Sequence, residues 1–457
     1  MLQQPHILTQ VARLCRHGIL ALLVTLATLY AVPATAAEKH PPIVFVHGNG
    51  DSAAIWIAQI WRFESNGYPR DRLFAIDMKY PYARGVDDKP QDGRSSTADA
   101  MHQLAGFVDM VRQKTGAAKV VLVGNSRGAN DIRNYVKNGG GAAFVSKVVL
   151  GGGVNHGVLI SDKALVGSEF NGGSAFMKQL NDGPNEVVKG VDFLTLRSDK
   201  NDKYAQPEGH ILGLPGTDTR ISYDAPALKG AKNLVLPGVD HRETAFSPAA
   251  FAKMYQFITG HAARRTSIAA EARPVLNGAV TGITAGVFDN VPVKDAKVTV
   301  FRVDPRTGAR QGKAVHSKVT GEDGLWGPFN ALPRAYYEFV VEVPGQPMTH
   351  IYRSPFPRGS DVVFLRPAQL GKGGDAAGSL VMMSRPRGYF GVGRDKMSLD
   401  GKPPAGLHAS VPVDSTAKLA LPAVPQRAVA GTFRGETITA RNWPMQEKQV
   451  AIIEFTY

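Results

Sequence analysis

Short apolar runs alternate with segments of helical pattern over the first 260 residues of the chain. Two of these segments, residues 97–115 and 129–137, are expected to be helices, and a third, residues 248–258, begins at a proline and ends before Gly260. The alternation predicts a mostly parallel sheet with helices on both faces. The apolar runs lie at residues 43–46, 73–78, 120–123, 148–150, 193–196 and 234–236.

The pattern changes after the basic stretch at residues 262–266, where short alternating strands and turn signals begin. This change predicts a domain boundary near residues 260–275, followed by an all-β region. The Gly-rich stretch at residues 371–378 is expected to be a linker or loop. The expected parts are an α/β domain with this parallel sheet at residues 38–262, a β-sandwich-like domain at residues 270–358, and a second β unit at residues 359–457.

The N-terminal 37 residues have the pattern of a secretory signal peptide. Arg13 and Arg16 precede an apolar run at residues 18–32, and a stretch of small residues follows. The run is shorter than the roughly 20 residues that a membrane-spanning helix needs, so a retained anchor is the less favoured alternative. We expect residues 1–37 to be removed by cleavage near Ala36 or Ala37, and the mature protein to be exported to the periplasm or beyond.

Composition narrows the chemistry that is expected of the mature chain. The only cysteine, Cys15, lies in the expected signal, so neither disulfides nor thiolate chemistry is expected after cleavage. The first 37 residues contain Arg13 and Arg16 but no acidic residue, so their removal lowers the formal charge from +14 to +12. This excess favours anionic surfaces such as membranes or acidic polymers, unless it serves solubility alone. The sequence shows no nucleic-acid motif and no H-E-x-x-H motif, and we expect neither a metal nor a cofactor.

The clearest chemical motif is an apolar strand that leads into a G-x-S-x-G turn and then a helix. It spans residues 120–130, with the sequence VVLVGNSRGAN. Gly124 and Gly128 permit the strained turn that lifts Ser126 to the top of the sheet, where a base can reach its hydroxyl. We therefore predict Ser126 as a nucleophile; the alternative is a structural serine in an ordinary strand-to-helix turn.

A second turn, His47-Gly48-Asn49-Gly50, follows the first apolar run. In an α/β-hydrolase this turn supplies one backbone donor for an oxyanion, and the residue after the nucleophile supplies the other. Alone, the turn would only close a strand. Together with the serine motif it predicts an oxyanion hole formed by the N–H groups of Asn49 and Arg127.

The general base should follow the last strand of the sheet. The run at residues 234–241 ends in a loop that carries His241, which is the favoured base. His47 is expected to be structural beneath its turn, and His156 and His210 are expected to be polar loop residues.

Two carboxylates in the loop after residues 193–196 compete for the role of the triad acid. We favour Asp202 over Asp199, because the layout Ser-x-x-x-Asp-x-x-x-x-Pro places Asp202 at the crest of the loop. The other aspartate is expected to cap the loop. The chain order Ser126, Asp202, His241 is the order found in α/β-hydrolases.

With these motifs the sequence resembles the class 2 type lipases of bacteria and archaea, in particular the branch in which a β-domain implicated in lipid binding follows the hydrolase domain. The resemblance covers roughly residues 41–260 and, more weakly, the β region. It implies that Ser126 attacks an ester carbonyl and that water activated through His241 hydrolyses the acyl-enzyme. The matching stretches include FVHG at residues 45–48, ESNGYP at 64–69, GSAFMKQLN at 173–181 and YRSPF at 352–356.

Two positions depart from the pattern of these lipases. Asn125 stands where a histidine is usual, and Arg127 replaces the more usual Met, Leu or Gln. Both changes are expected to alter the floor of the pocket. Arg127 is expected either to favour a negatively charged substrate or to pack at the start of its helix.

The segment at residues 155–190 separates two core strands and contains Gly, Ser and apolar residues, as a lid or pocket wall would. Under this hypothesis Leu159, Leu165, Phe170 and Phe176 line or cover the acyl site. The alternative is an ordinary excursion that packs on the sheet.

The sequence therefore favours an exported serine carboxylic-ester hydrolase, an esterase or lipase. Its expected partners are an ester or lipid substrate and a membrane or polymer surface held by the β-domains. One alternative is an extracellular polyester (polyhydroxyalkanoate) hydrolase, and another is a non-catalytic surface-binding protein with a relic hydrolase domain. Amide or thioester hydrolysis would use the same three residues.

Overall fold

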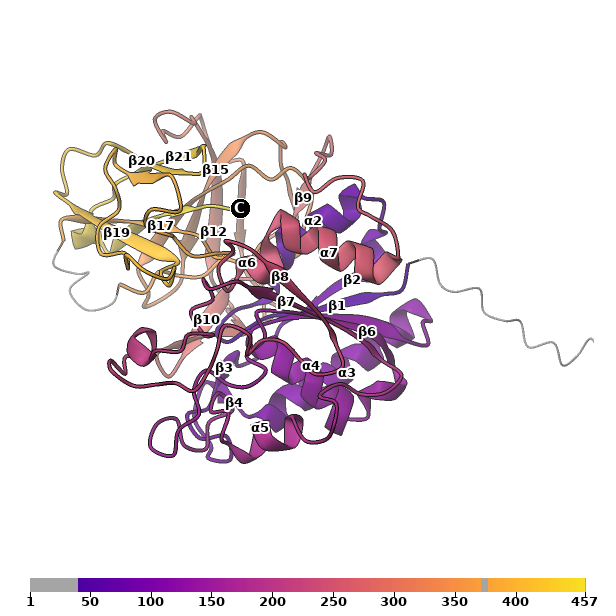
Figure 1. The fold of residues 1–457 in the computed structure, drawn as a ribbon. Coiled ribbons are helices and arrows are strands. Elements are labelled where there is room, and N and C mark those ends of the chain that lie inside the picture. The colour runs from indigo at the N-terminus through magenta and orange to yellow at the C-terminus, as the bar shows by residue number, and fades with distance from the viewer. Residues whose placement is uncertain (1–39, 371–376, 457) are drawn as a thin grey trace, which may run out of the picture. The chain divides into compact units, whose positions relative to one another are not determined.

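In the computed structural model, which describes residues 40–370 and 377–456, six parallel strands form the first sheet in the order β2-β1-β5-β6-β7-β8 (Figure 1). The predicted parallel sheet is confirmed. The expected signal peptide, Cys15 and most of the Gly-rich stretch lie outside the described residues. The strands are β1 (Ile43–Val46), β2 (Leu73–Ile76), β5 (Val120–Asn125), β6 (Val145–Gly151), β7 (Asp192–Ser198) and β8 (Lys232–Leu236), and β3 (Tyr82–Ala83) and β4 (Arg94–Ser95) form a small separate pair.

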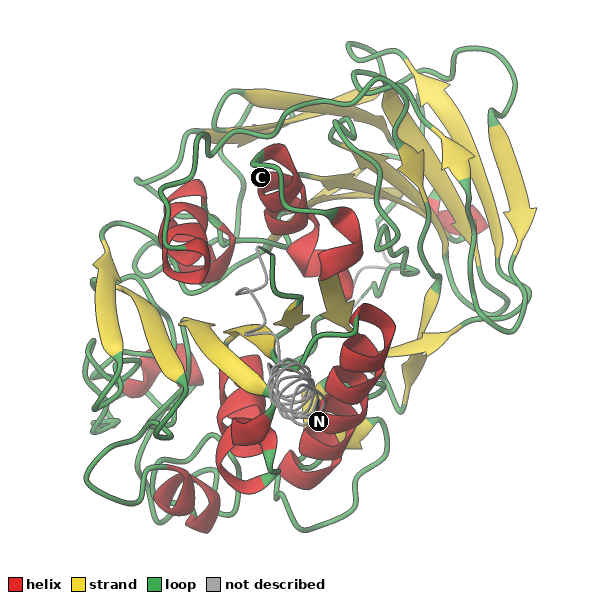
Figure 2. Ribbon diagram, turned by 90° about the vertical axis from the view of Figure 1, so that its right-hand side faces the viewer, coloured by secondary structure: helices red, strands yellow, loops and turns green. Residues whose placement is uncertain are grey.

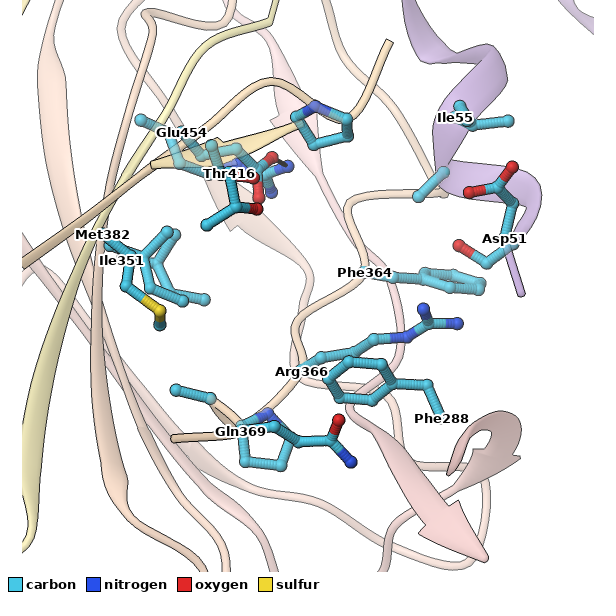
Figure 3. A pocket seen from close by; sticks show the side chains of 18 of the residues that line it. Asp51, Ile55, Phe288, Ile351, Phe364, Arg366, Gln369, Met382, Thr416 and Glu454 are labelled. Atoms are coloured by element: carbon cyan, nitrogen blue, oxygen red, sulfur yellow. Dashed lines mark hydrogen bonds and ion pairs between the residues drawn. The ribbon is translucent and has the colours of Figure 1, made fainter. Parts of the chain in front are cut away.

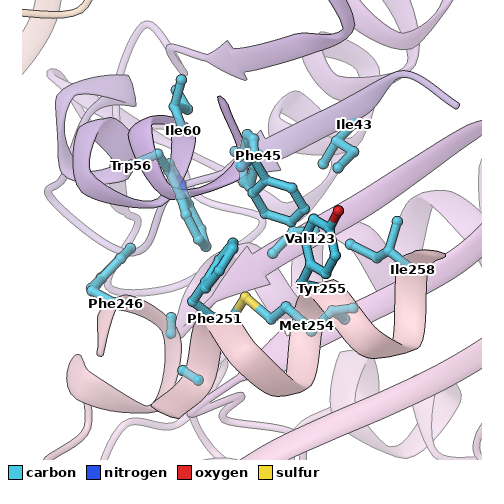
Figure 4. Close-up of a cluster of buried hydrophobic side chains, with 14 of the residues drawn as sticks. Ile43, Phe45, Trp56, Ile60, Val123, Phe246, Phe251, Met254, Tyr255 and Ile258 are labelled. Atoms are coloured by element: carbon cyan, nitrogen blue, oxygen red, sulfur yellow. The ribbon is translucent and has the colours of Figure 1, made fainter. Parts of the chain in front are cut away.

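Helices cover both faces of this sheet, with α2 and α7 on one face and α3 and α4 on the other (Figures 1 and 2). Successive residues of a strand point to opposite faces, so Ile43 and Phe45 pack toward α2 and α7, whereas Val44 and Val46 pack toward α3 and α4. Figure 4 shows the first of these two cores. The helices are α2 (Ile57–Ser65), α3 (Thr97–Thr115), α4 (Arg127–Asn138), α5 (Ala175–Leu180), α6 (Glu243–Phe246) and α7 (Pro248–Thr259).

Capping residues fix the ends of two predicted helices. Ser96 accepts a hydrogen bond from the N–H of Asp99, whose side chain accepts one from the N–H of Ser96. This capping box starts α3, and the left-handed Gly116 ends it. Helix α7 begins with Pro248 and ends before the left-handed Gly260, as the sequence predicts.

The C-terminal region is built around a seven-stranded mixed sheet in the order β13-β12-β15-β16-β22-β17-β19. Strand β22 runs parallel to both of its neighbours, and the other pairs are antiparallel. The strands of the region are β9 (Val275–Leu276), β10 (Thr281–Thr284), β11 (Val287–Pro292), β12 (Lys297–Val303), β13 (His316–Val319), β14 (Phe329–Asn330), β15 (Tyr336–Glu342), β16 (Met348–Arg353), β17 (Ser379–Ser384), β18 (Met397–Leu399), β19 (Thr416–Leu421), β20 (Ala428–Phe433), β21 (Glu436–Arg441) and β22 (Gln449–Glu454).

This sheet is continuous across the division expected between residues 358 and 359. Strand β16 precedes the division, and it pairs with β22 from Met348↔Gln449 to Arg353↔Glu454. Val450, Ala451 and Ile453 of β22 are buried in the centre of the sheet. The expected division therefore does not separate two sheets, because the last strand inserts between β16 and β17.

Helix α2 joins the two sheets. Its Ile57 and Trp61 belong to the hydrophobic core of the β region, together with the buried Trp326. The indole N–H of Trp61 donates to the carbonyl of Gly359 at 2.8 Å. From Pro42 onward the chain forms one compact unit. None of the helices in the described part of the chain is both long and apolar enough to cross a membrane.

Candidate active site

Ser126 stands at the junction of β5 and α4 in a strained backbone conformation. Its φ of 57° and ψ of −123° lie in a region that residues with a side chain rarely adopt. The N–H of Ser126 donates to the carbonyl of Gly151 at 3.2 Å. The predicted strand-turn-helix elbow is present, and it carries the serine at its apex.

The two glycines of the elbow allow close approach of neighbouring backbone. A Cβ atom on Gly128 would lie 2.6 Å from the carbonyl oxygens of Val46 and His47. A Cβ on Gly124 would lie 2.8 Å from the carbonyl oxygen of Gly128. A side chain at either position would push strand β5, helix α4 or the end of β1 apart.

The turn after β1 lies directly beside Ser126. A Cβ on Gly48 would be 2.9 Å from the Cβ of Ser126, and Asn49 lines the same cavity as the serine. The side-chain oxygen of Asn49 accepts the N–H of Ala83 at 2.8 Å, which fixes the turn. The N–H of Arg127 belongs to the first turn of α4, where N–H groups have no partner within the helix. Asn49 and Arg127, the two residues predicted to supply oxyanion donors, therefore both lie in segments that adjoin the serine.

His47 supports this turn as a neutral structural residue. Its Nδ1 lies 2.9 Å from the carbonyl of Gly48, and its Nε2 accepts the N–H of Met78 at 3.0 Å. Burial lowers the pKa of His47 to about 4, so the ring is neutral near pH 7 and can accept at Nε2.

His241, which lines the cavity, forms a buried pair with Asp202. The Nδ1 atom of His241 lies 2.8 Å from Oδ1 of Asp202, which also accepts the N–H of Tyr204 at 2.9 Å. The Nε2 atom of His241 is buried and has no hydrogen-bond partner among the described residues. The ring edge of Tyr204 packs against the imidazole at 4.7 Å between centroids. This geometry orients His241 and leaves Nε2 available for a proton.

Asp199, the competing carboxylate, has a different position. It accepts the N–H of Lys200 at 2.7 Å and that of Gly238 at 3.1 Å. Asp199 therefore joins its own loop to the turn after β8, whereas Asp202 contacts His241.

Ser126 and His241 line a single cavity of 390 Å³. Leu165 and Phe170 line it as the lid hypothesis expects, whereas Leu159 is buried in an adjacent apolar cluster and Phe176 is not among the lining residues. The cavity that contains the serine is therefore lined in part by apolar side chains. The other apolar lining residues are Val154, Val158, Leu212 and Val413.

The comparisons with known proteins agree with this geometry. Residues 40–206 match the model of the class 2 lipases, and residues 275–370 match the model of the lipase C-terminal domain. Over residues 40–206 the chain is similar to the class 2 lipases. This similarity supports a hydrolase of the lipase and esterase type, and the first domain has the α/β-hydrolase fold.

Similar solved structures include a Bacillus licheniformis lipase in its mature form, with 21% sequence identity and a TM-score of 0.36. The match covers 50% of this chain and 95% of that lipase. A Paleococcus ferrophilus monoacylglycerol lipase has 14% identity and a TM-score of 0.32, covering 49% of this chain and 97% of that one. Aspergillus fumigatus lipase B has 12% identity and a TM-score of 0.36, covering 51% of this chain and 56% of that one.

Arg127, which follows Ser126, has a structural role. The guanidinium of Arg127 is fully buried and binds both carboxylate oxygens of Glu169, at 2.8 and 3.0 Å. It also donates to the carbonyls of Pro81 and Ser95. The suggestion that Arg127 contacts a negatively charged substrate is therefore wrong, because its charge is neutralised within the fold. Asn125 donates to the carbonyl of Gly151 at 2.8 Å and lines the cavity.

Sequence reasoning missed the residues that the C-terminal region brings to this site. Tyr389 and Ser415 line the catalytic cavity, and Arg385 and Arg394 bind the acidic residues on either side of His241. The only signal in the sequence is a cluster of basic residues at positions 385–394, which no local motif connects to the histidine.

A second cavity of 390 Å³ lies between the start of the hydrolase domain and the mixed sheet (Figure 3). Ile351 and Met382 form one wall, and Phe288 and Phe364 lie on the opposite side. Asp51 lines both cavities and pairs with Arg242 at 2.7 Å. Among the described residues, no group of three or more His, Cys, Asp or Glu side chains could hold a metal ion.

Proposed function

We propose that this protein is an exported serine carboxylic-ester hydrolase that acts through Ser126, His241 and Asp202. The observation that carries the proposal is the shared cavity. It is lined by a serine on a strained elbow and by a histidine whose Nδ1 is held 2.8 Å from a buried carboxylate. A nucleophile, an oriented base and an orienting acid are the parts that this chemistry needs.

In the proposed reaction, Ser126 Oγ attacks the ester carbonyl while Nε2 of His241 takes its proton. Asp202 holds the imidazole in the required tautomer and stabilises its charged form. The N–H groups of Asn49 and Arg127 donate to the oxyanion, and each such donor is typically worth about 3 kcal/mol. His241 then protonates the leaving alcohol, and water activated by the same histidine hydrolyses the acyl-enzyme.

The lining of the cavity supports an ester with an apolar acyl chain. Leu165 and Phe170 provide an apolar wall within the cavity that contains Ser126. Apolar walls with a few polar groups are typical of small-molecule sites. The β region, which contains a lipase C-terminal domain, is proposed to hold a lipid surface or an insoluble polymer. The basic charge of the chain favours an anionic surface.

The test is hydrolysis of p-nitrophenyl esters from acetyl to palmitoyl by the mature protein. We expect turnover by the wild type and a loss of about 10⁴-fold or more in Ser126→Ala. Alanine keeps the Cβ atom, so the strain of the elbow is unchanged. Ser146→Ala is the matched control, because Ser146 lies on β6 outside the cavity lining, and it should retain full activity.

The alternatives predict different results in the same experiments. A relic domain would hydrolyse none of the esters, and the wild type would then behave like Ser126→Ala. A polyester hydrolase would favour polymer granules over lipid vesicles, which can be measured by sedimentation of inactive Ser126→Ala protein with each. Export is tested by expressing the full chain in a bacterium and determining the N-terminus of the mature protein, which should lie near residue 37.

A further inference from the structure

The C-terminal β region forms part of the cavity that contains Ser126 and His241. Tyr389, Val413 and Ser415 belong to the lining. The ring of Tyr389 is buried, and Nζ of Lys203 lies 4.2 Å from its centroid. Lys203 also donates to the carbonyl of Val413 at 3.2 Å. The cavity is thus closed on one side by a segment far from the catalytic motifs in sequence.

Two buried carboxylates close the turn in which His241 lies. Oδ1 of Asp240 accepts the N–H groups of Arg242 and Glu243, at 3.0 and 2.9 Å. In return, Oε2 of Glu243 accepts the N–H of Asp240 at 3.0 Å. The hydroxyl of Thr244 donates to the carbonyl of His241 at 2.6 Å. The backbone around the histidine is therefore fixed by the positions of these two acidic side chains.

Three arginines from the β region hold the two acidic side chains. Arg385 lies 3.2 Å from Oδ2 of Asp240 and also hydrogen-bonds to Glu243. Arg394 lies 3.2 Å from the same Oδ2 atom and 3.0 Å from Oε2 of Glu243. Arg434 lies 2.8 Å from Oε1 of Glu243. The exposed fraction of the arginine side chain rises from 3% at Arg385 to 20% at Arg394 and 46% at Arg434.

The charges of this cluster depend on one another. Burial raises the pKa of Asp240, and the nearby Glu243 raises it further. Burial also acts to raise the pKa of Glu243, but Arg385, Arg394 and Arg434 outweigh it and lower that pKa to about 2. Loss of Arg385 or Arg394 would leave the two carboxylates with less compensating positive charge in a low-dielectric site, which favours movement of the turn or uptake of a proton.

We propose that Arg385 and Arg394 are positioning residues of the active site, which hold the turn of His241 in register with Asp202 through Asp240 and Glu243. The inference rests on the proposed serine-hydrolase function. Asp202 lies on the loop after β7 and His241 on the turn after β8, so their alignment depends on what fixes each segment. A displacement of about 1 Å in a catalytic group costs on the order of 100-fold in rate. The C-terminal region thus positions the catalytic histidine in addition to lining the cavity.

The test compares Arg394→Gln, Arg385→Met and Arg385→Lys with the wild type. For each we would measure kcat and KM for p-nitrophenyl butyrate against pH, and the rate at which a fluorophosphonate labels the protein. We expect Arg394→Gln and Arg385→Met to lower kcat and the labelling rate by about 10- to 100-fold with little change in KM, and to shift the acid limb of the pH profile. Arg385→Lys should recover part of the loss, because lysine restores the charge but not the two-carboxylate contact.

The matched control is Arg427→Gln. Arg427 forms an ion pair with Asp400 at 2.6 Å within the same β region, and neither residue lines the catalytic cavity. This variant should keep wild-type kcat and pH dependence. If Arg385 variants fail to fold, Arg434→Gln keeps the test open, because its half-exposed contact to Glu243 should cost only about threefold in kcat.

The outcomes separate the two proposals. Folded Arg394→Gln and Arg385→Met protein that is labelled as fast as the wild type, with an unchanged pH profile, would overturn the positioning role and leave the serine-hydrolase function standing. Wild-type protein that neither hydrolyses the ester nor reacts with the fluorophosphonate would overturn the proposed function itself. An equal loss in Arg427→Gln would show that general destabilisation lowers the rate, and would also overturn the positioning role.

Discussion

The nucleophile and the base of the candidate site are held in place in two different ways. Ser126 and the turn at Asn49 are fixed by backbone contacts, which the absence of side chains at Gly48 and Gly128 makes possible. His241 is instead fixed by ion pairs between acidic side chains and arginines of the β region. The first arrangement is local to the hydrolase domain, and the second depends on a distant part of the chain.

We call Ser126 and the turn at Asn49 the nucleophile half of the site, and His241 with Asp202 the base half. The difference between them indicates which conditions each half should tolerate. Backbone packing has little dependence on protonation, whereas a cluster of buried charges fails when one partner is removed. His47 is the exception on the nucleophile side, because a buried neutral ring must take up a proton at low pH. The predictions below separate the two halves, from the largest expected effect to the smallest.

The largest effect is expected at the acid of the base half. Asp202→Asn should lower kcat for p-nitrophenyl esters by about 10³- to 10⁴-fold, because asparagine cannot hold the required tautomer of His241. Asp199→Asn is the matched control and should lose less than about tenfold, because Asp199 only joins two loops. A reversed ranking of the two variants would assign the triad to Asp199.

Acid should weaken the nucleophile half through His47. Unfolded His47 takes up a proton near pH 6.5, whereas folded His47 does so only near pH 4, so the unfolded state binds more protons between these values. The free energy of unfolding should therefore fall by about 3 kcal/mol from this residue as the pH drops from 6.5 to 4.

This pH dependence can be measured by urea unfolding at several pH values. His47→Asn should show a flatter dependence over this range than the wild type. His210→Asn, which changes a largely exposed histidine, should leave the dependence unchanged. Equal slopes in the wild type and His47→Asn would contradict the assignment of a buried neutral ring.

A side chain at the elbow should damage the nucleophile half directly. Gly128→Ala would bring Cβ to 2.6 Å from two carbonyl oxygens, and we expect it to cost about 1–3 kcal/mol of stability. Gly106→Ala is the matched control, because Gly106 lies exposed in α3 with open space around it, and alanine there should stabilise the fold by about 1 kcal/mol. Thermal unfolding of both variants tests this. Equal melting temperatures would show that the backbone around the elbow accommodates the added Cβ without loss of stability.

The smallest effect is expected at the cavity wall. Substitutions there leave both the nucleophile half and the base half intact, so they show what the wall alone contributes. Replacing Leu165 and Phe170 with Ser should shift the chain-length preference toward shorter esters, while Ser126 remains reactive. Each methylene of the acyl chain that loses its apolar contact should weaken transition-state binding by about 1 kcal/mol. Val166→Ser, at an exposed neighbour outside the cavity lining, should keep the wild-type profile. An unchanged profile in the double variant would remove the lid hypothesis.

The sequence allowed the parallel sheet and the elbow to be predicted because both follow from local patterns. Strand β5 is a continuous apolar run, and the glycines beside Ser126 have close backbone neighbours that only glycine tolerates. Helix α2 was not predicted. Ile60 and Phe63 pack in the hydrolase core, whereas Ile57 and Trp61 pack in the core of the β region, so the helix lacks the single apolar face that a pattern would reveal.

The base half depends on contacts between residues far apart in the sequence, which local patterns do not reveal. His241 and Asp202 were predicted from their order along the sheet, but Arg385 and Asp240 are 145 residues apart and share no motif. The continuity of the mixed sheet was missed for the same reason, since β22 pairs with β16 across about a hundred residues of chain. Contacts of this kind depend on topology, which one sequence does not reveal.

The central claim is that Ser126 is a nucleophile activated by His241, and a mapped covalent adduct tests it most directly. The protein would be treated with a fluorophosphonate, digested with trypsin, and analysed by mass spectrometry of the peptide from Val120 to Arg127. We predict a single adduct on Ser126, absent from Ser126→Ala and formed far more slowly in His241→Ala. An unmodified peptide, an adduct on another residue, or equal labelling of His241→Ala would contradict the account.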